Sequence, residues 1–116
     1  MGYTMIKLVP PVTVRYFQSL NQEISCLDWL HRLKDSVGRS RLFVRIDRLE
    51  RGHLGDYRPV GHGIYELRDH YGPGYRIYFG VLGPQEVVIL CAGDKSTQKQ
   101  DIARAIRYFD LIRGAV

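Results

Sequence analysis

Two arginines that flank a glycine-rich turn are the first candidates for chemistry in this sequence. Arg68 and Arg76 lie in two alternating apolar–polar segments, separated by the turn at Gly72–Gly74. Such alternation predicts strands, and the turn makes them antiparallel neighbours whose two arginines share one face. Guanidinium groups bind phosphate oxygens through paired N–H donors, so the pattern predicts a phosphate cradle. The alternative is a pair of surface arginines bound to Glu66 or Asp69, which would contribute about 0–1 kcal/mol each.

Lys95 is the third candidate. It lies between the apolar run Val87–Ala92, a predicted buried strand, and a helix predicted to begin near Thr97. A lysine at this position can bind a phosphate that also lies at the helix N-terminus. Nearby arginine charges would favour its neutral amine, which could act as a base. An ion pair with Asp94 explains the residue equally well.

Aromatic and imidazole groups accompany the arginines. Tyr71 and Tyr78 can stack on nucleic-acid bases, and His70 is the histidine nearest to the arginine pair. His62 lies at the other end of the same predicted strand, on the same face as His70. At roughly 3.3 Å per residue, that strand holds the two histidines too far apart to act as acid and base on one phosphate.

We expect no metal and no cofactor. The four histidines have no ligand spacing with Cys26 or Cys91, and these two cysteines are expected to be buried apolar groups. With only two cysteines there is no disulfide framework, which is typical of a reduced, cytoplasmic protein. No apolar stretch is long enough to span a membrane.

The charge balance suggests a polyanionic partner. The 116 residues include 17 Lys and Arg against 12 Asp and Glu, for a net charge of +5, and 13 of the basic residues are Arg. Arginine suits phosphate geometry, so nucleic acid is the first expectation.

A hydrophobic share of 45% and a charged share of 25% are those of one globular domain, which excludes a disordered chain.

The periodicity predicts an α+β domain over residues 1–116. A small antiparallel sheet is covered on one face by two N-terminal helices, and a C-terminal helix follows. The other sheet face is expected to be wet and to carry Arg68, His70, Arg76 and Tyr78. The stripe Arg41, Arg45 and Arg48 is expected to be a solvated helix face, or else to contact an acidic segment or RNA. The predicted strands are 12–17, 57–60, 64–71, 75–81 and 87–92. The first predicted helix is 26–34 and is capped by Ser25, and the second is 39–51, after a break at 35–38. The third predicted helix is capped by Thr97.

Several motifs together resemble the RelE/ParE superfamily of bacterial toxins, and most closely its HigB-like branch of addiction-module killer proteins. The resemblance covers the chain from about Tyr16 to its end, and residues 1–10 are expected to be a loose N-terminal extension. It is carried by Glu66–Arg68, Tyr71–Phe79, Gly93–Gln98 with Asp101-Ile102, Trp29-Leu30, Arg48-Leu49, Gly55-Asp56 and Pro59–Gly61.

The resemblance implies a toxin of a type II toxin–antitoxin module. Its partners would be a cognate antitoxin, of helix-turn-helix type, and the ribosome with its messenger RNA. Its activity would be ribosome-dependent, metal-independent cleavage of that RNA. By motif, Arg68, Arg76 and Lys95 occupy catalytic positions, and Arg58 stands where nuclease members place a basic RNA-binding residue.

One departure from the family pattern keeps other functions open. The catalytic Tyr or His that some nuclease members carry near the C-terminus has no clear equivalent, since Tyr108 lies deep within the last predicted helix. The alternatives are a ParE-type toxin, which binds DNA gyrase without nuclease activity, and a degenerate domain that only binds an antitoxin or RNA.

Overall fold

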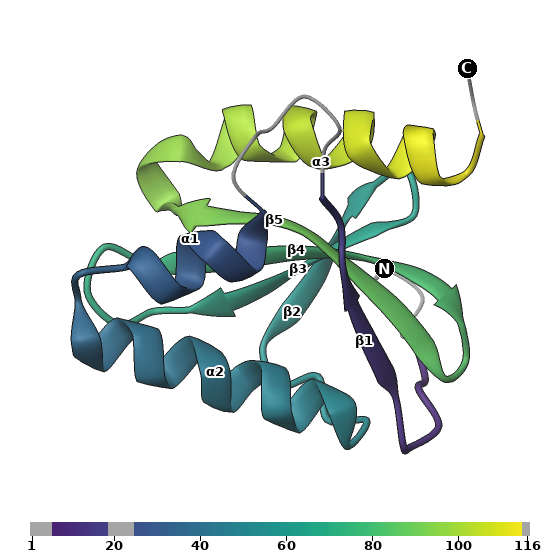
Figure 1. Cartoon of the computed structure of the whole chain (residues 1–116), viewed down its shortest axis with the longest axis horizontal. Coiled ribbons are helices and arrows are strands. Elements are labelled where there is room, and N and C mark those ends of the chain that lie inside the picture. The colour runs from purple at the N-terminus through teal and green to yellow at the C-terminus, as the bar shows by residue number, and fades with distance from the viewer. Residues whose placement is uncertain (1–5, 19–24, 115–116) are drawn as a thin grey trace, which may run out of the picture.

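A mixed five-stranded sheet forms the centre of the structure, a computed structural model that describes residues 6–18 and 25–114 (Figure 1). The strand order is β1-β5-β4-β3-β2. All neighbouring strands are antiparallel except β1 and β5, which are parallel. The strands are β1 (Thr13–Tyr16), β2 (Tyr57–Gly61), β3 (Ile64–Asp69), β4 (Tyr75–Gly83) and β5 (Glu86–Asp94).

The prediction of a small, purely antiparallel sheet is therefore wrong, although the α+β class is confirmed. The parallel pair arises because β1 is separated from the other strands by two helices. That long connection lets β1 pair with β5 at the far side of the sheet from β2. The four later strands form the meander that their short glycine-rich turns predict.

Two N-terminal helices follow β1, namely α1 (Cys26–Arg32) and α2 (Ser36–Glu50). The Ser25 hydroxyl accepts the Asp28 N–H at 3.2 Å, as the capping pattern predicts. The expected break between the two helices is present, but it lies at residues 33–35 instead of 35–38. The Asp35 carboxylate accepts the Gly38 N–H at 3.0 Å, so α2 begins at Ser36. Gly38 is needed there because a side-chain Cβ would come within 2.5 Å of the Tyr75 ring.

The sheet separates two apolar clusters. One contains Leu30 of α1 and Leu42 of α2, packed against Leu67 and Ile77 of the sheet. The other contains residues of the C-terminal helix α3 (Gln98–Ile112), which packs on sheet residues that include Tyr78 and Val88. Figure 1 shows α3 on the opposite side of the sheet from α1 and α2.

The sheet face expected to be wet is therefore covered, and that expectation is wrong. Ala105, Tyr108 and Phe109 form the buried stripe of α3, and Phe109 packs directly over Gly80. A Cβ on Gly80 would lie 2.5 Å from that ring, so β4 can carry no side chain at this position. The aromatic residues of α3 need an apolar surface, and this face of the sheet supplies it.

The predicted loose extension packs on the domain within its described part. Leu8 is buried, and the Val9 N–H donates to the Pro84 carbonyl at 2.8 Å. Residues 1–5 lie outside the described part of the chain. Among the described residues, no helix has the length and apolar character that a bilayer crossing requires.

Candidate functional site

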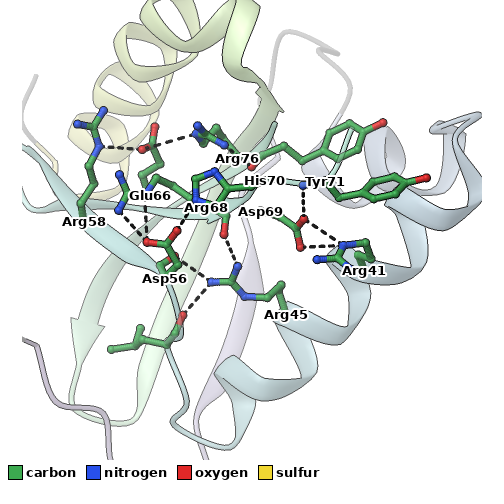
Figure 2. Close-up of polar contacts among 12 residues, drawn as sticks. Arg41, Arg45, Asp56, Arg58, Glu66, Arg68, Asp69, His70, Tyr71 and Arg76 are labelled. Carbon is green, nitrogen blue, oxygen red and sulfur yellow. Dashed lines mark hydrogen bonds and ion pairs between the residues drawn. The ribbon is translucent and has the colours of Figure 1, made fainter. Parts of the chain in front are cut away.

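Strand register places most of the predicted site residues on the sheet face that α3 covers. Arg68 of β3 is paired with Arg76 of β4, and Glu66 is paired with Tyr78. On the other side of β3, Arg58 of β2 is paired with Glu66. The side chains of directly paired residues share a face, so basic and acidic groups from three strands meet here (Figure 2).

Glu66 is the buried centre of this cluster, with no exposed surface. Its Oε1 accepts the Nε–H of Arg58 at 2.9 Å, and its Oε2 accepts from the Gln98 amide at 2.8 Å. The Arg76 Nε lies 3.8 Å from Oε1. Both carboxylate oxygens are therefore satisfied, and the negative charge is compensated by two guanidinium groups. A buried carboxylate needs such partners. Glu66 is therefore a buried anchor rather than the surface partner of arginine that its sequence position suggests.

Arg76 is buried rather than exposed, with 6% of its surface accessible. It donates to the Tyr75 carbonyl at 3.0 Å, whereas its buried Nε has no hydrogen-bond acceptor within the described structure. The expectation that Arg76 projects into solvent is therefore wrong, because α3 and Gln98 close over this part of the sheet. Its charge still contributes to the potential at the neighbouring surface.

Tyr78 is also buried completely. Burial raises the pKa of its hydroxyl, and the Glu66 carboxylate raises it further. The ring packs among Ile64, Leu90 and Tyr108 in the apolar cluster under α3. It therefore has no free face on which a base could stack, so the predicted stacking role of Tyr78 is wrong in this fold.

Arg68 and His70 share the carboxylate of Asp56, a residue that belongs to the motif but was not among the predicted site residues. The Arg68 Nη2 donates to Asp56 Oδ1 at 2.7 Å, and the His70 Nε2 lies 2.7 Å from Asp56 Oδ2. Neither Glu66 nor Asp69 is the partner of Arg68 among the contacts described. Partial burial alone would raise the pKa of Asp56, but the hydrogen bonds from Arg68 and His70 outweigh it and hold that pKa below its usual range.

Arg45 positions this acidic group from α2. It donates to the carbonyls of Leu54 at 2.9 Å and Asp56 at 3.0 Å, and also to the Arg68 carbonyl. These bonds fasten the 54–56 segment to the end of β3, which places Asp56 between Arg68 and His70 (Figure 2). Burial lowers the pKa of Arg45. Arg45 is thus a structural clamp rather than part of a solvated stripe.

Lys95 is exposed at the first position of the 3₁₀ turn η1 (Lys95–Thr97). Asp94 does not pair with it among the described contacts, since its carboxylate caps the Ser96 N–H at 2.8 Å. Thr97 precedes α3 as predicted, but its side chain forms no cap hydrogen bond, because the Thr97 hydroxyl donates to Asp101 at 2.6 Å. A Cβ on Gly74 would lie 3.4 Å both from the Lys95 Cβ and from the Arg76 Nη1. The Arg76 guanidinium and the base of the Lys95 side chain therefore both lie against Gly74.

Tyr71 belongs to a different surface. Its backbone N–H donates to Asp69 at 2.9 Å, and the Arg41 guanidinium lies 5.3 Å from its ring centroid. Arg41 also donates to Asp69 at 3.1 Å. In Figure 2 these residues lie beside α2, apart from the Glu66 cluster. Tyr71 therefore contacts the α2 side of the site through Arg41 and Asp69 rather than the Glu66 cluster that holds Arg58.

The described residues contain no group of three or more His, Cys, Asp or Glu side chains that could hold a metal ion. Cys26 and Cys91 are both buried and free, as expected. Burial raises the pKa of both thiols, which makes them poor nucleophiles.

Comparison with known proteins identifies the family. Residues 28–110 match the family model described as phage-derived protein Gp49-like (DUF891), so the chain belongs to the Gp49-like family, whose members are RelE-like toxins. A Haemophilus influenzae protein, described as uncharacterized, is 44% identical over 77 residues, which cover 66% of this chain and 78% of that protein. No solved structure matches the chain.

Proposed function

We propose that this protein is the toxin of a type II toxin–antitoxin module of RelE/HigB type. It would act in the cytoplasm as a ribosome-dependent endoribonuclease that inhibits translation. The observation that carries the proposal is the group of cations at one end of the sheet. Arg58, Arg68, Arg76 and Lys95 are brought there from three strands and a helical turn, and the buried carboxylate of Glu66 holds two of them in place.

The proposed reaction is attack of a ribose 2′-hydroxyl on the adjacent phosphate. It needs a base for the hydroxyl proton, an acid for the departing 5′-oxygen, and cations for the charge that develops on the phosphorane. Arg58, Arg68 and Lys95 have the exposure needed to contact a phosphate. Arg76 is buried, but Gly74, which has no side chain, lies against its guanidinium group. Its positive charge would therefore add to the potential at the phosphate.

His70 is the best-placed group for proton transfer. Imidazole exchanges protons readily near neutral pH. The ring of His70 is exposed, and Asp56 orients it from 2.7 Å while also holding Arg68. A phosphate bound by Arg68 would therefore lie close to an oriented imidazole. The contact with the carboxylate fixes the orientation of the ring.

Dependence on the ribosome follows from how open the site is. The cations Arg58, Arg68 and Lys95 are partly or fully exposed, and the pocket that Arg68 and His70 line is open to solvent. Such a site stabilises charge but does little to hold the reacting oxygen in line with the leaving group. The ribosome would supply that orientation, which is worth several kcal/mol in general.

A gyrase-binding toxin of ParE type is the second candidate. It is favoured by one observation, namely that Arg58, Arg68 and Arg76 already have carboxylate partners within the protein. Arginines with such partners can serve folding alone. A binding protein would need no oriented His70, and this feature distinguishes the two functions.

The test is a purified, reconstituted translation reaction. Added protein should stop peptide synthesis and shorten the template only when ribosomes occupy it. Protein with the double substitution Arg68→Ala and Lys95→Ala is the control. Inhibition of purified gyrase, together with an intact template, would instead establish the second candidate.

A further inference from the structure

The outer face of α2 carries an uncovered surface that differs from the candidate nuclease site. Val37 and Val44 are 52% and 48% exposed, and Tyr71, beside the same helix, is 38% exposed. Single exposed apolar residues are ordinary, but these three lie around the same arginine, Arg41. We call this surface the α2 patch, and it consists of Val37, Ser40, Arg41, Val44, Arg48 and Tyr71.

The α2 patch has the spacing of a binding stripe. Its helical members recur every three or four residues, so they form one continuous row along α2. The Arg41 guanidinium lies over the Tyr71 ring, which joins the helix to the turn between β3 and β4. An open pocket of about 290 Å³ lies along this row, lined by Ser40, Arg41, Val44, Arg45, Arg48 and Asp69.

The charge of the α2 patch is positive and incompletely compensated. Arg41 is paired with Asp69, and Arg45 is occupied by backbone carbonyls. Within the described residues, the Arg48 guanidinium forms no ion pair or side-chain hydrogen bond. Arg41, Arg45 and Arg48 line the same pocket. Burial lowers the pKa of Arg45, and the positive charges of Arg48 and Arg41 lower it further.

We propose that the α2 patch binds an acidic, amphipathic segment of a protein partner. Apolar side chains of that segment would pack on Val37, Val44 and Tyr71, and its carboxylates would bind Arg48 and Arg41. Nucleic acid fits this surface less well. Two exposed valines offer nothing for base stacking, whereas apolar side chains of a peptide can pack on them.

The position of the α2 patch gives such a segment a route to the candidate nuclease site. A second pocket, of about 270 Å³, shares Arg41, Arg45, Arg48 and Asp69 with the first and extends to Asp56, Arg68 and His70. A segment lying along α2 could therefore place a carboxylate beside Arg68 and compete with a phosphate there. This consequence rests on the proposed function, since it makes the segment the inhibitory part of the antitoxin. The binding itself does not rest on it.

The experiment is a titration of ¹⁵N-labelled protein followed by amide chemical shifts. The probe is a synthetic helix-forming peptide with leucines along one face and glutamates beside them. The comparison probes are a peptide of the same composition in scrambled order and a single-stranded RNA. The protein variants are Arg48→Glu and Val44→Ser. Lys99→Glu is the charge-matched control, because Lys99 is exposed in the first turn of α3, on the other side of the sheet.

We expect the amphipathic peptide to shift amides of residues 37–48 and 69–71. Arg48→Glu should weaken its binding by roughly tenfold, whereas Lys99→Glu should not change it beyond about twofold. RNA should shift residues near Arg58 and Lys95 instead. Shifts elsewhere on the protein, equal binding of the scrambled peptide, or stronger shifts of the α2 patch by RNA would each overturn the proposal.

Failure of the proposed function would look different. If the wild-type protein neither stops translation nor cuts RNA, the toxin assignment fails while the peptide titration still tests the α2 patch. If the protein is toxic but the peptide does not bind this surface, only the further inference fails.

Discussion

The Arg58 Nε–H donates to Glu66 Oε1 over 2.9 Å, between directly paired residues of β2 and β3. Arg58 is partly exposed, whereas Glu66 is completely buried. The pair therefore connects the surface where a phosphate would bind to an anchor inside the protein. The candidate site is built on this carboxylate rather than on a freely solvated row of arginines.

Replacing Glu66 tests the anchor. Glu66→Gln leaves Arg58 and the buried Arg76 facing a neutral amide, and loss of one partner from a buried ion pair costs about 3–5 kcal/mol. We expect the free energy of unfolding in urea to fall by about 3 kcal/mol, near the lower end of that range, because the amide keeps some hydrogen bonds. Glu86→Gln is the matched control, since Glu86 pairs with Arg15 at the surface. Equal losses for the two variants would show that Glu66 is not an anchor.

Two strand glycines provide a second test of the fold around the site. A Cβ on Gly93 would lie 1.9 Å from an Asp101 carboxylate oxygen and 2.6 Å from the Thr97 hydroxyl. Gly93→Ala should therefore force β5 and α3 apart and destabilise the protein by about 1–3 kcal/mol or more. In Gly83→Ala the new Cβ meets nothing within 4 Å. Thermal melting of both variants checks the difference, and equal melting temperatures would contradict the close approach of α3 to β5.

Arg68→Ala separates activity from folding. The ion pair with Asp56 lies at the surface, so its loss should cost about 1 kcal/mol or less. If Arg68 stabilises phosphorane charge, the same change should remove on the order of 3 kcal/mol of transition-state stabilisation, roughly 100-fold in rate. Arg68→Lys should restore only part of this rate, because an ammonium group lacks the paired, coplanar N–H donors of a guanidinium group.

Leu67→Ala is the control for this experiment. Leu67 is 2% exposed and lies on the opposite face of β3, so its loss should cost about 2–5 kcal/mol of stability. Melting curves and growth arrest are measured for the two variants together. A folded Arg68→Ala protein that remains fully toxic would remove Arg68 from the mechanism and favour a binding function.

Lowering the pH should reduce the free energy of unfolding, because protonation of Asp69 removes a stabilising charge. Partial burial would raise the pKa of this carboxyl, but the Tyr71 N–H and the Arg41 guanidinium outweigh it and lower the pKa. The unfolded chain therefore binds the proton more tightly than the folded protein does. The stabilisation is complete above the ordinary carboxyl pKa of about 4 and is lost as pH falls through the lowered value.

Asp69→Asn makes this prediction measurable. The difference in unfolding free energy between wild type and Asp69→Asn should be large at about pH 6 and should shrink by about pH 3. Urea denaturation at several pH values gives that difference. Asp47→Asn, which affects only an exposed ion pair with Arg51, is the control. A difference that stays constant with pH would contradict the role of Asp69.

Local patterns in the sequence were sufficient to predict the strands of the meander and which residues share a face. The alternation around Arg68 and Arg76 predicts their pairing, because side-chain direction in a strand depends only on position. Ser25 likewise predicts the start of α1, because a helix cap is a contact between close neighbours in sequence.

Long-range features were not predictable in the same way. The burial of Arg76 and Tyr78 depends on where α3 packs, and periodicity within α3 does not specify which sheet face it covers. Asp56 was missed because its role requires Arg45, from another element, to fasten its backbone to β3. The parallel pairing of β1 with β5 also depends on the global arrangement of the chain.

Mapping of RNA 5′ ends after induction in cells tests most directly the proposal that the protein cuts messenger RNA on the ribosome. The account predicts new ends within translated regions, at positions in phase with codons, within minutes of induction. Cells producing the folded Arg68→Ala variant should show far fewer of these ends. Intact messages, accompanied by DNA breaks and a DNA-damage response, would contradict the claim.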